Sequence, residues 1–211
     1  MSKTVCIYPQ NDDTTFFLRP LCDHVCSTFD AKEVNYCSSD IHSCDKIFDE
    51  IKDAETIFFL GHGESTCLYA SISENSVALF NKENSSILKN KKLFLLACNS
   101  GQFIKNCDFH NAIGFGFLPT SLYDARHARK LHSLRIEHLK EDDIKCYNNS
   151  LVNALIKTLS VATLTDFFLL KERLKFNISR EIVHILLEKG TPNYRMIADV
   201  TYYIYKDLTI C

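Results

Sequence analysis

The sequence is poor in glycine and has no tryptophan, with 6 Gly and 4 Pro among its 211 residues. It also lacks a strong charge of either sign, because 24 Lys and Arg stand against 26 Asp and Glu, a net charge of −2. Nucleic-acid-binding domains usually carry a clear excess of basic residues, and disordered chains carry a large net charge with few apolar residues. The composition therefore excludes both classes, and we expect no nucleic-acid partner.

Long apolar runs are also missing. No stretch approaches the roughly 18–20 residues of a membrane-spanning helix, so we expect no membrane association. The first residues, MSKTVCIYPQNDD, hold one Lys and a short β-like run broken by Pro9, which does not resemble a signal peptide. The 10 cysteines are then expected to be free thiols in a reducing, cytoplasmic setting, because a chain of this length with 46% hydrophobic residues needs no disulfides to fold.

The few glycines are concentrated in one region, with five of the six between positions 61 and 116. Gly61 and Gly63 flank His62, and Gly101 lies shortly after Cys98. A chain that uses Gly so sparingly is expected to place it where the backbone approaches another group closely or takes a positive φ. The distribution therefore draws attention to His62 and Cys98.

The apolar pattern predicts a parallel α/β sheet. Residues 56–60 (TIFFL) and 92–97 (KLFLLA) are continuous apolar runs of strand length, typical of strands that are buried on both faces and separated by amphipathic helices. Strands are predicted at 4–8, 32–37, 56–60, 92–97 and 112–118, a hairpin at 67–71 and 77–80, and helices at 15–29, 41–54, 85–90, 147–159, 161–176 and 179–189. We therefore expect one α/β domain over 1–211, with a mostly parallel sheet flanked by helices and a functional crevice at the carboxyl ends of the strands.

The second half of the chain changes character after the last predicted strand. Residues 121–146 form a polar insertion, and 177–211 form a helical C-terminal extension whose role the sequence does not indicate. Ser179 is a good N-cap and Gly190 is a good helix stop, which together predict a separate helix over 179–189. The last segment, 194–208, is predicted to be a helix or a mixture of strand and helix.

His62 and Cys98 each follow a predicted buried strand directly. If those strands are neighbours, both side chains reach the same edge of the sheet. Cys98 would then lie near the N-terminus of a short helix, where the helix dipole favours the thiolate. His62 can protonate a leaving amine, and the backbone amides of Gly63 and Cys98 can hold the oxyanion of a tetrahedral intermediate. The pattern predicts a Cys–His dyad for nucleophilic catalysis.

Two segments carry a family resemblance, IFFLGHG at 57–63 and LFLLACNSG at 93–101. They resemble the His-Gly and Ala-Cys motifs of caspase-like cysteine peptidases (clan CD), most closely the CHAT branch, which includes relatives of separase. The resemblance implies a caspase-like fold in which His62 is the catalytic histidine, Cys98 the nucleophile and Gly63 an oxyanion donor. It extends over roughly residues 1–176, because 112–118 resembles the following core strand and 147–174 the closing helix pair.

The resemblance implies a cysteine endopeptidase that cleaves a protein substrate and requires neither a metal ion nor an organic cofactor. Small relatives of this kind act in microbial and antiviral defence or in programmed cell death. Only 12 residues separate Cys98 from Asn111, which leaves little room for the self-cleaved linker that activates classical caspases. Residues 121–146 are longer than the usual insertion, and 177–211 have no counterpart. We therefore expect regulation by a protein partner or a ligand through these segments.

The substrate pocket is the least determined part of the site. Ala97 precedes Cys98, so the acidic neighbour with which metacaspases bind Arg or Lys is absent. Asp12 and Asp13 follow the first predicted strand and are candidates for a substrate-binding pocket that prefers a basic P1 residue. The alternative is that these two acids belong to a solvated loop.

Two other functional classes stay open. One is a catalytically silent interaction module of the same fold. The other is a flavodoxin-like domain that binds a ligand at its strand ends. The sequence lacks the glycine-rich loop that would surround a phosphate in such a domain, which argues against this class.

Two further motifs have simple structural alternatives. Cys22, His24 and Cys26 suggest a zinc site, but their spacing matches none of the usual structural knuckles, and no metal site is predicted. The histidines of the 121–146 insertion lie among basic residues that can contact RNA or another protein. A solvated helix face is the simpler interpretation of that stretch. These histidines are His127, His132 and His138.

Overall fold

The computed structural model describes residues 3–9, 12–36, 42–69, 77–125 and 138–211. Its centre is a six-stranded sheet in the order β2-β1-β3-β7-β8-β9. The first five strands of that order are mutually parallel, and β9 pairs antiparallel with β8. The predicted α/β class with a mostly parallel sheet is confirmed.

The strands of this sheet are short and largely buried. They are β1 (Thr4–Pro9), β2 (Lys32–Tyr36), β3 (Thr56–Leu60), β7 (Lys92–Leu96), β8 (Ala112–Gly114) and β9 (Thr209–Ile210). A second, three-stranded antiparallel sheet follows β3 directly; it consists of β4 (His62–Gly63), β5 (Cys67–Tyr69) and β6 (Phe80–Asn81). The predicted hairpin is therefore present, although residues 70–76 between its strands lie outside the described part of the chain.

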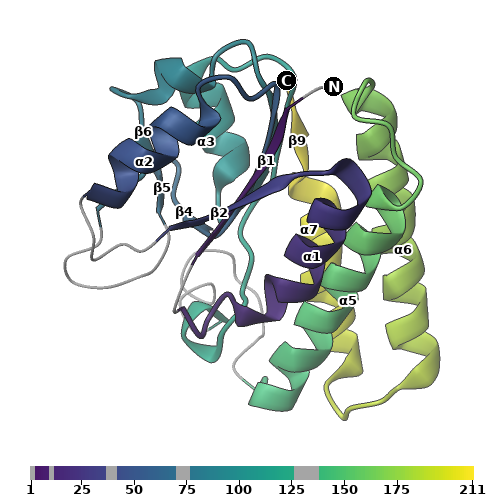
Figure 1. Cartoon of the computed structure of the whole chain (residues 1–211). Helices are drawn as coiled ribbons and strands as arrows, with labels where there is room; N and C mark the ends of the chain where they lie inside the picture. The colour runs from purple at the N-terminus through teal and green to yellow at the C-terminus, as the bar shows by residue number, and fades with distance from the viewer. Residues whose placement is uncertain (1–2, 10–11, 37–41, 70–76, 126–137) are drawn as a thin grey trace.

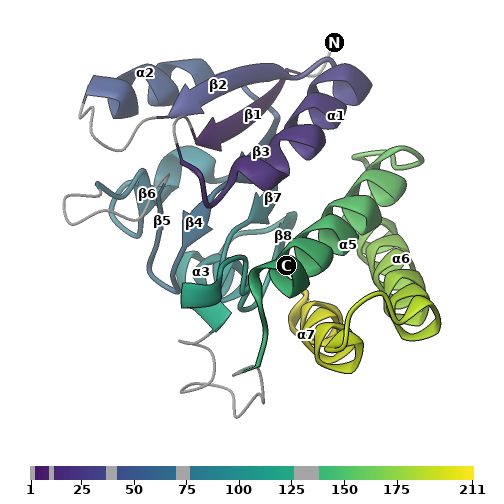
Figure 2. The same ribbon diagram turned by 90° about the horizontal axis from the view of Figure 1, so that it is seen from below.

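Helices cover both faces of the large sheet (Figure 1). One face packs against α1, α5, α6 and α7, and the other against α2, α3 and the small sheet, an arrangement that Figure 2 shows from below. The helices are α1 (Arg19–Phe29), α2 (His42–Ile51), α3 (Ser100–Cys107), α5 (Glu141–Leu159), α6 (Phe167–Glu188) and α7 (Tyr194–Asp207), with 3-10 turns η1 (Phe16–Leu18) and η2 (Ser85–Leu88).

The continuous apolar runs arise because each central strand contributes to two cores. In β3, Phe58 and Leu60 pack with the helices of one face, while Ile57 and Phe59 pack with those of the other. Alternate side chains of a strand point to opposite faces, so a strand covered on both sides has no solvent-facing position. This burial fixes the strand ends, and the residues that follow them, on a rigid frame.

The C-terminal part differs from its prediction. Instead of two helices over 161–176 and 179–189, the chain forms one continuous helix, α6, capped by the Asp166 carboxylate, which accepts from the N–H of Leu169 at 2.9 Å. Ser179 lies inside this helix and donates its hydroxyl to the carbonyl of Lys175 at 2.9 Å. A serine can bond to the preceding turn of a helix as well as cap one, so its presence alone does not mark a start.

The end of the chain returns to the sheet. Residues 194–207 form the helix α7, and β9 then adds an antiparallel edge strand to β8. The preceding strand is shorter than predicted, because β8 covers Ala112–Gly114 rather than 112–118. Residues 115–118 instead cross the carboxyl edge of the sheet as irregular chain. The C-terminal extension is thus part of the folded body.

Within the described residues, none of the helices has both the length and the apolar composition needed to cross a bilayer. Cys37 of the second predicted strand and His127 and His132 of the polar insertion lie outside the described residues.

Candidate active site

The candidate site lies at the carboxyl edge of the large sheet. The strand order reverses between β1 and β3, and in open α/β sheets such a reversal opens a crevice beyond the strand ends. Asp12 lies in the segment after β1, His62 begins β4 immediately after β3, and Cys98 follows β7. The sheet therefore brings three chemically competent side chains from three neighbouring strands to one edge.

His62 is buried and held by hydrogen bonds. Its Nε2 lies 2.7 Å from Oδ2 of Asp12 and 2.9 Å from Oγ1 of Thr14. Its ring stacks against Tyr69, with the ring centroids 6.0 Å apart and the planes inclined by 18°. These contacts fix the plane of the imidazole and engage one of its two nitrogens.

Asp12 is the partner that decides which nitrogen of His62 carries the proton. Burial acts to raise the pKa of Asp12, but hydrogen bonds from His62 and Thr14 outweigh it and hold that pKa below its usual range. An ionised carboxylate can only accept hydrogen bonds, so Nε2 of His62 is the protonated nitrogen and Nδ1 carries the lone pair of the neutral ring. Asp12 thus orients the imidazole as a base.

Cys98 is half-buried and lies just before helix α3. The chain turns at Asn99, whose φ of 54° is left-handed, so that the sulfur follows the end of β7 and precedes the first turn of the helix. The thiol donates to the carbonyl oxygen of Leu118 at 3.2 Å, and the sulfur accepts from the N–H of Leu118 at 3.4 Å. No hydrogen bond joins Cys98 to His62 in the part of the chain that the structure describes.

The thiol is protonated in this arrangement. Burial raises the pKa of Cys98 to about 12, against the lowering effect of the Leu118 N–H, and the negative charge of Asp124 adds to the increase. The expected activation of a thiolate by the N-terminus of α3 is therefore wrong for this state. Desolvation disfavours the charged form of a buried thiol more than a short helix stabilises it.

The two predicted oxyanion donors lie side by side. A Cβ atom built on Gly63 would lie 3.0 Å from both the carbonyl oxygen of Cys98 and the Cβ of Ala97, which only a glycine avoids without displacement. The backbone N–H of Cys98 has no acceptor among the described residues. The backbones of Gly63 and Cys98 therefore approach each other closely, and the N–H of Cys98 is available as a hydrogen-bond donor.

His62 and Cys98 line a common cavity of about 460 Å³. Its wall also includes two acidic side chains, Glu64 and Asp124, and three aromatic ones, Tyr69, Phe117 and Tyr123. No Lys or Arg lines this cavity among the described residues. A second, much smaller hollow, lined by Leu18 and Leu151 among others, also touches both His62 and Cys98. The imidazole and the thiol therefore face shared space.

Two acids of this wall were missed by the sequence analysis. Glu64 follows the His-Gly motif by one position, which was an available signal, but Asp124 lies in the polar insertion, far along the chain. Asp124 accepts from the hydroxyl of Ser121 at 2.7 Å, which fixes its carboxylate at the start of the next turn. The predicted pocket acids behave differently: Asp12 is engaged with His62, while Asp13 is exposed. Their role in substrate binding stays a prediction.

A separate group of three thiols lies between β1 and α1. Cys6, Cys22 and Cys26 place their sulfur atoms within 4.8 Å of one another, and Cys6 and Cys22 are fully buried. His24, their neighbour in the sequence motif, points elsewhere and lies near Ser160, with 3.2 Å between its Nε2 and Oγ of Ser160. Three thiolates suit a soft metal ion, whereas structural zinc needs a fourth ligand, and this group has none among the described residues.

No protein-family model matches the chain, and no curated protein matches it.

Proposed function

We propose that this protein is a caspase-like cysteine endopeptidase whose catalytic pair is His62 and Cys98. One observation carries the proposal: an imidazole that is oriented by a buried carboxylate and a thiol that follows the neighbouring strand line the same cavity. A nucleophile, a base and a group that orients the base form the minimal set for acyl transfer through a covalent intermediate.

The geometry supports a simple reaction sequence. The Cys98 thiol gives its proton to Nδ1 of His62, and the sulfur attacks the scissile carbonyl carbon to form a C–S bond. The amides of Gly63 and Cys98 stabilise the oxyanion. His62 then passes the proton to the leaving amine as the C–N bond breaks, which leaves a thioester. Water, deprotonated by His62, hydrolyses the thioester and restores the thiol.

Catalysis requires the Cys98 sulfur to break its hydrogen bonds with the backbone of Leu118. In the state described here, the thiol is bonded to the backbone of Leu118 and its pKa is about 12. A substrate that fills the cavity would exchange these contacts for contacts with His62 and the carbonyl carbon. The protein is therefore proposed to rest in an inactive state, which agrees with the expectation that a partner or ligand regulates it.

The cavity favours a basic substrate residue. Glu64 and Asp124 supply two carboxylates to its wall, and none of the described lysines or arginines compensates them there. Charged partners of one sign raise the local concentration of the opposite charge and penalise like charges. We propose that the enzyme cleaves proteins after Arg or Lys, with Glu64 and Asp124 as the recognition residues, because Asp12 and Asp13, which the sequence suggested for this role, do not line the cavity.

The proposal is tested with a peptide library that varies the P1 residue. The wild-type protein is expected to cleave peptides with basic P1 residues, and Cys98→Ala is expected to abolish cleavage. Cys211→Ala, which changes an exposed thiol outside the site, is the control and should cleave at the wild-type rate. Cleavage that survives Cys98→Ala would overturn the assignment of the nucleophile.

The second candidate is a catalytically silent interaction module with the same fold. The raised pKa of Cys98 and the Leu118 contacts favour it, because they describe a thiol that is not activated. Two results together would support this alternative. No peptide of the library would be cleaved, and Cys98 would be alkylated no faster than the other thiols in the presence of partners.

A further inference from the structure

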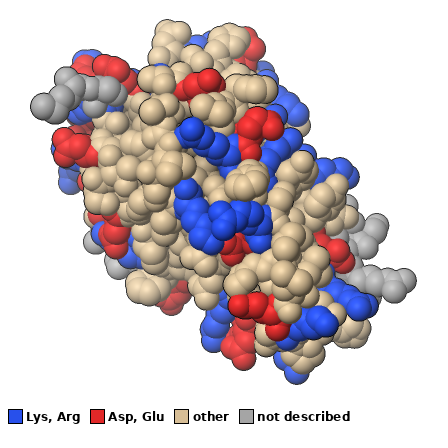
Figure 3. Space-filling view, turned by 90° about the vertical axis from the view of Figure 1, so that its right-hand side faces the viewer, with Lys and Arg blue, Asp and Glu red and all other residues tan. Residues whose placement is uncertain are grey.

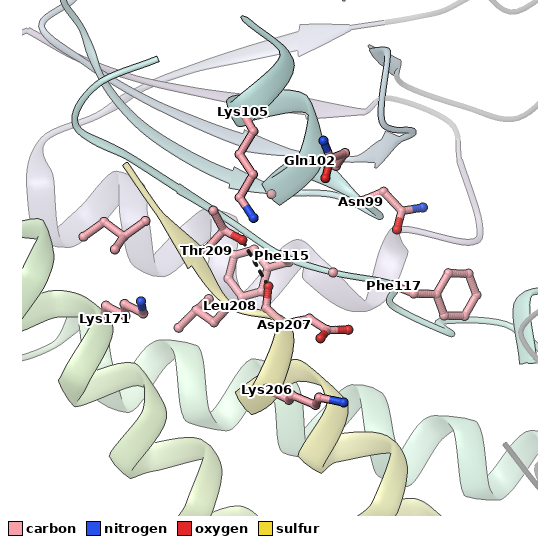
Figure 4. A pocket seen from close by; sticks show the side chains of 13 residues that line it. Asn99, Gln102, Lys105, Phe115, Phe117, Lys171, Lys206, Asp207, Leu208 and Thr209 are labelled. Atoms are coloured by element: carbon pink, nitrogen blue, oxygen red, sulfur yellow. Dashed lines mark hydrogen bonds between the residues drawn. The ribbon is translucent and has the colours of Figure 1, made fainter. Parts of the chain in front are cut away.

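Another cavity, of about 500 Å³, adjoins the candidate active site. It is bounded by α3, by residues 115–117 and by the C-terminal segment that joins α7 to β9 (Figure 4). Its size lies within the usual range for small-molecule sites, roughly 300–1,000 Å³. The C-terminal extension, for which the sequence indicated no role, forms one wall of this cavity.

Three lysines from three different helices line the cavity: Lys105 of α3, Lys171 of α6 and Lys206 of α7. Figure 4 shows Lys105 extending from α3 toward Thr209. None of the three forms an ion pair with a carboxylate among the described residues. Asp207 is the only acid in the described lining, so the cavity carries an excess of positive charge.

Figure 3 looks at the side of the molecule on which α6 lies and shows Lys and Arg gathered near the middle of that face. The cavity wall itself holds three Lys against one Asp, and this excess of positive charge raises the local concentration of anions. Lysine ammonium groups are flexible point charges with several donors, which suits the terminal oxygens of phosphates.

In the wall between α3 and β9, two glycines pack closely against side chains of the C-terminal segment. A Cβ on Gly101 would lie 2.7 Å from Oγ1 of Thr209, and one on Gly116 would collide with the side chain of Asp207. Glycine at both positions lets the C-terminal segment approach the helix and the crossing chain. The cavity is therefore built by tight tertiary packing and is not simply a gap beside a loop.

We infer that this cavity binds a small organic phosphate of the nucleotide class, with its phosphates on Lys105, Lys171 and Lys206. Phe117 also lines this cavity, and aromatic side chains are the groups on which nucleobases stack. The ligand would neutralise the lysines and fill a preformed space, the two conditions under which anionic ligands bind well.

The position of the cavity couples it to Cys98. Asn99 and Phe117 line both the lysine cavity and the candidate active site. The N–H of Asn99 donates to the carbonyl of Gly116 at 2.8 Å, and Leu118, two residues later, holds the sulfur of Cys98. A ligand that shifts residues 116 and 117 therefore changes the contacts that hold the thiol. This regulatory part rests on the proposed function, whereas the binding part does not.

Binding is tested by calorimetry at low salt on the Cys98→Ala protein, with pyrophosphate, ATP and adenosine as probes. Pyrophosphate and ATP should bind saturably, ATP more tightly, while adenosine should bind at least about tenfold more weakly than ATP. The double variant Lys171→Ala/Lys206→Ala should weaken ATP binding by about tenfold or more. The control variant Lys46→Ala/Lys82→Ala removes the same charge from exposed positions elsewhere. It should change the affinity for ATP by less than about twofold.

Three results would overturn the binding site: no saturable binding of either phosphate probe, adenosine as tight as ATP, or an equal loss in both double variants. The substituted lysines lie at the surface or at the cavity wall, so each variant is expected to fold. Thermal unfolding of each variant checks this.

Coupling is tested by the alkylation rate of Cys98 in the wild-type protein, measured by peptide mass spectrometry. Saturating ATP should change this rate by about threefold or more, and the change should disappear in Lys171→Ala/Lys206→Ala. An unchanged rate at saturation would overturn the regulatory part. Alkylation does not require peptidase activity, so this result is distinct from a failure of the proposed function.

Discussion

The two halves of the candidate site differ in how well their reactive groups are prepared for chemistry. On the side of β1 and β3, His62 is oriented by Asp12 and Thr14, with 2.7 Å between Nε2 and the Asp12 carboxylate. On the side of β7, the Cys98 thiol is hydrogen-bonded to the backbone of Leu118, and its pKa is raised to about 12. Both groups follow neighbouring strands, and His62 is buried while Cys98 is half-buried. The imidazole is oriented for proton transfer, whereas the thiol is not activated.

The difference shows that burial alone does not set the protonation state of an ionisable group. Asp12 keeps its charge because hydrogen bonds from His62 and Thr14 outweigh its desolvation. Among the described residues, the N–H of Leu118 is the one group that stabilises a negative charge on Cys98, and the carboxylate of Asp124 opposes it. The partners of a buried group therefore decide whether its charged form persists.

The largest effect is expected from removing the carboxylate that orients His62. Asp12→Asn replaces an acceptor with a group that can also donate, so Nε2 is no longer the favoured site of the imidazole proton. We expect kcat/KM for the best library peptide to fall by about 100-fold or more. Asp13→Asn, which changes the exposed neighbour, should stay within about twofold. Equal activity of the Asp12→Asn protein would show that the imidazole needs no partner.

A smaller effect is expected in the reactivity of the thiol. In the free protein at neutral pH, Cys98 should react with iodoacetamide about 30-fold more slowly than the exposed Cys211, because little of it is thiolate. A raised pKa means that the neutral form persists at neutral pH, so the rate should keep rising as pH increases above 9 toward the pKa of about 12. A plateau below about pH 8 would contradict the described environment of the sulfur.

The smallest effect is expected at Thr14. Its hydroxyl donates to Asp12 at 2.7 Å and lies 2.9 Å from His62, but it is exposed and water can replace it. Thr14→Val should therefore lower kcat/KM by about threefold. A loss as large as that of Asp12→Asn would mean that the hydroxyl, rather than the carboxylate, orients the ring.

The strands that carry the site could be predicted from the sequence with good accuracy. The apolar run 56–60 matches β3 at both ends, and 92–97 exceeds β7 by one residue. Such runs are distinctive because a strand buried on both faces has no polar position. The placement of His62 and Cys98 at one edge followed from the parallel arrangement of these two strands.

The hydrogen-bond partners and protonation of His62 and Cys98 could not be predicted in the same way. The contact of Cys98 with Leu118 joins residues 20 positions apart through irregular chain that the sequence suggested was strand. Asp12 was visible only as one of two acids after a strand, and nothing local distinguished it from Asp13. Ser179 illustrates the same limit, because its hydroxyl satisfies a carbonyl inside α6 instead of starting a helix. Tertiary contacts decide each of these cases.

The most direct test of the account is the labelling of Cys98 by a peptidyl acyloxymethyl ketone with a basic P1 residue, compared with its alkylation by iodoacetamide. The ketone needs the imidazole and the oxyanion donors, whereas iodoacetamide needs only the sulfur. His62→Ala is predicted to slow ketone labelling by about 100-fold or more while changing iodoacetamide alkylation by less than about threefold. Ketone labelling at the same rate in the wild type and in His62→Ala would contradict a catalytic partnership between the two side chains.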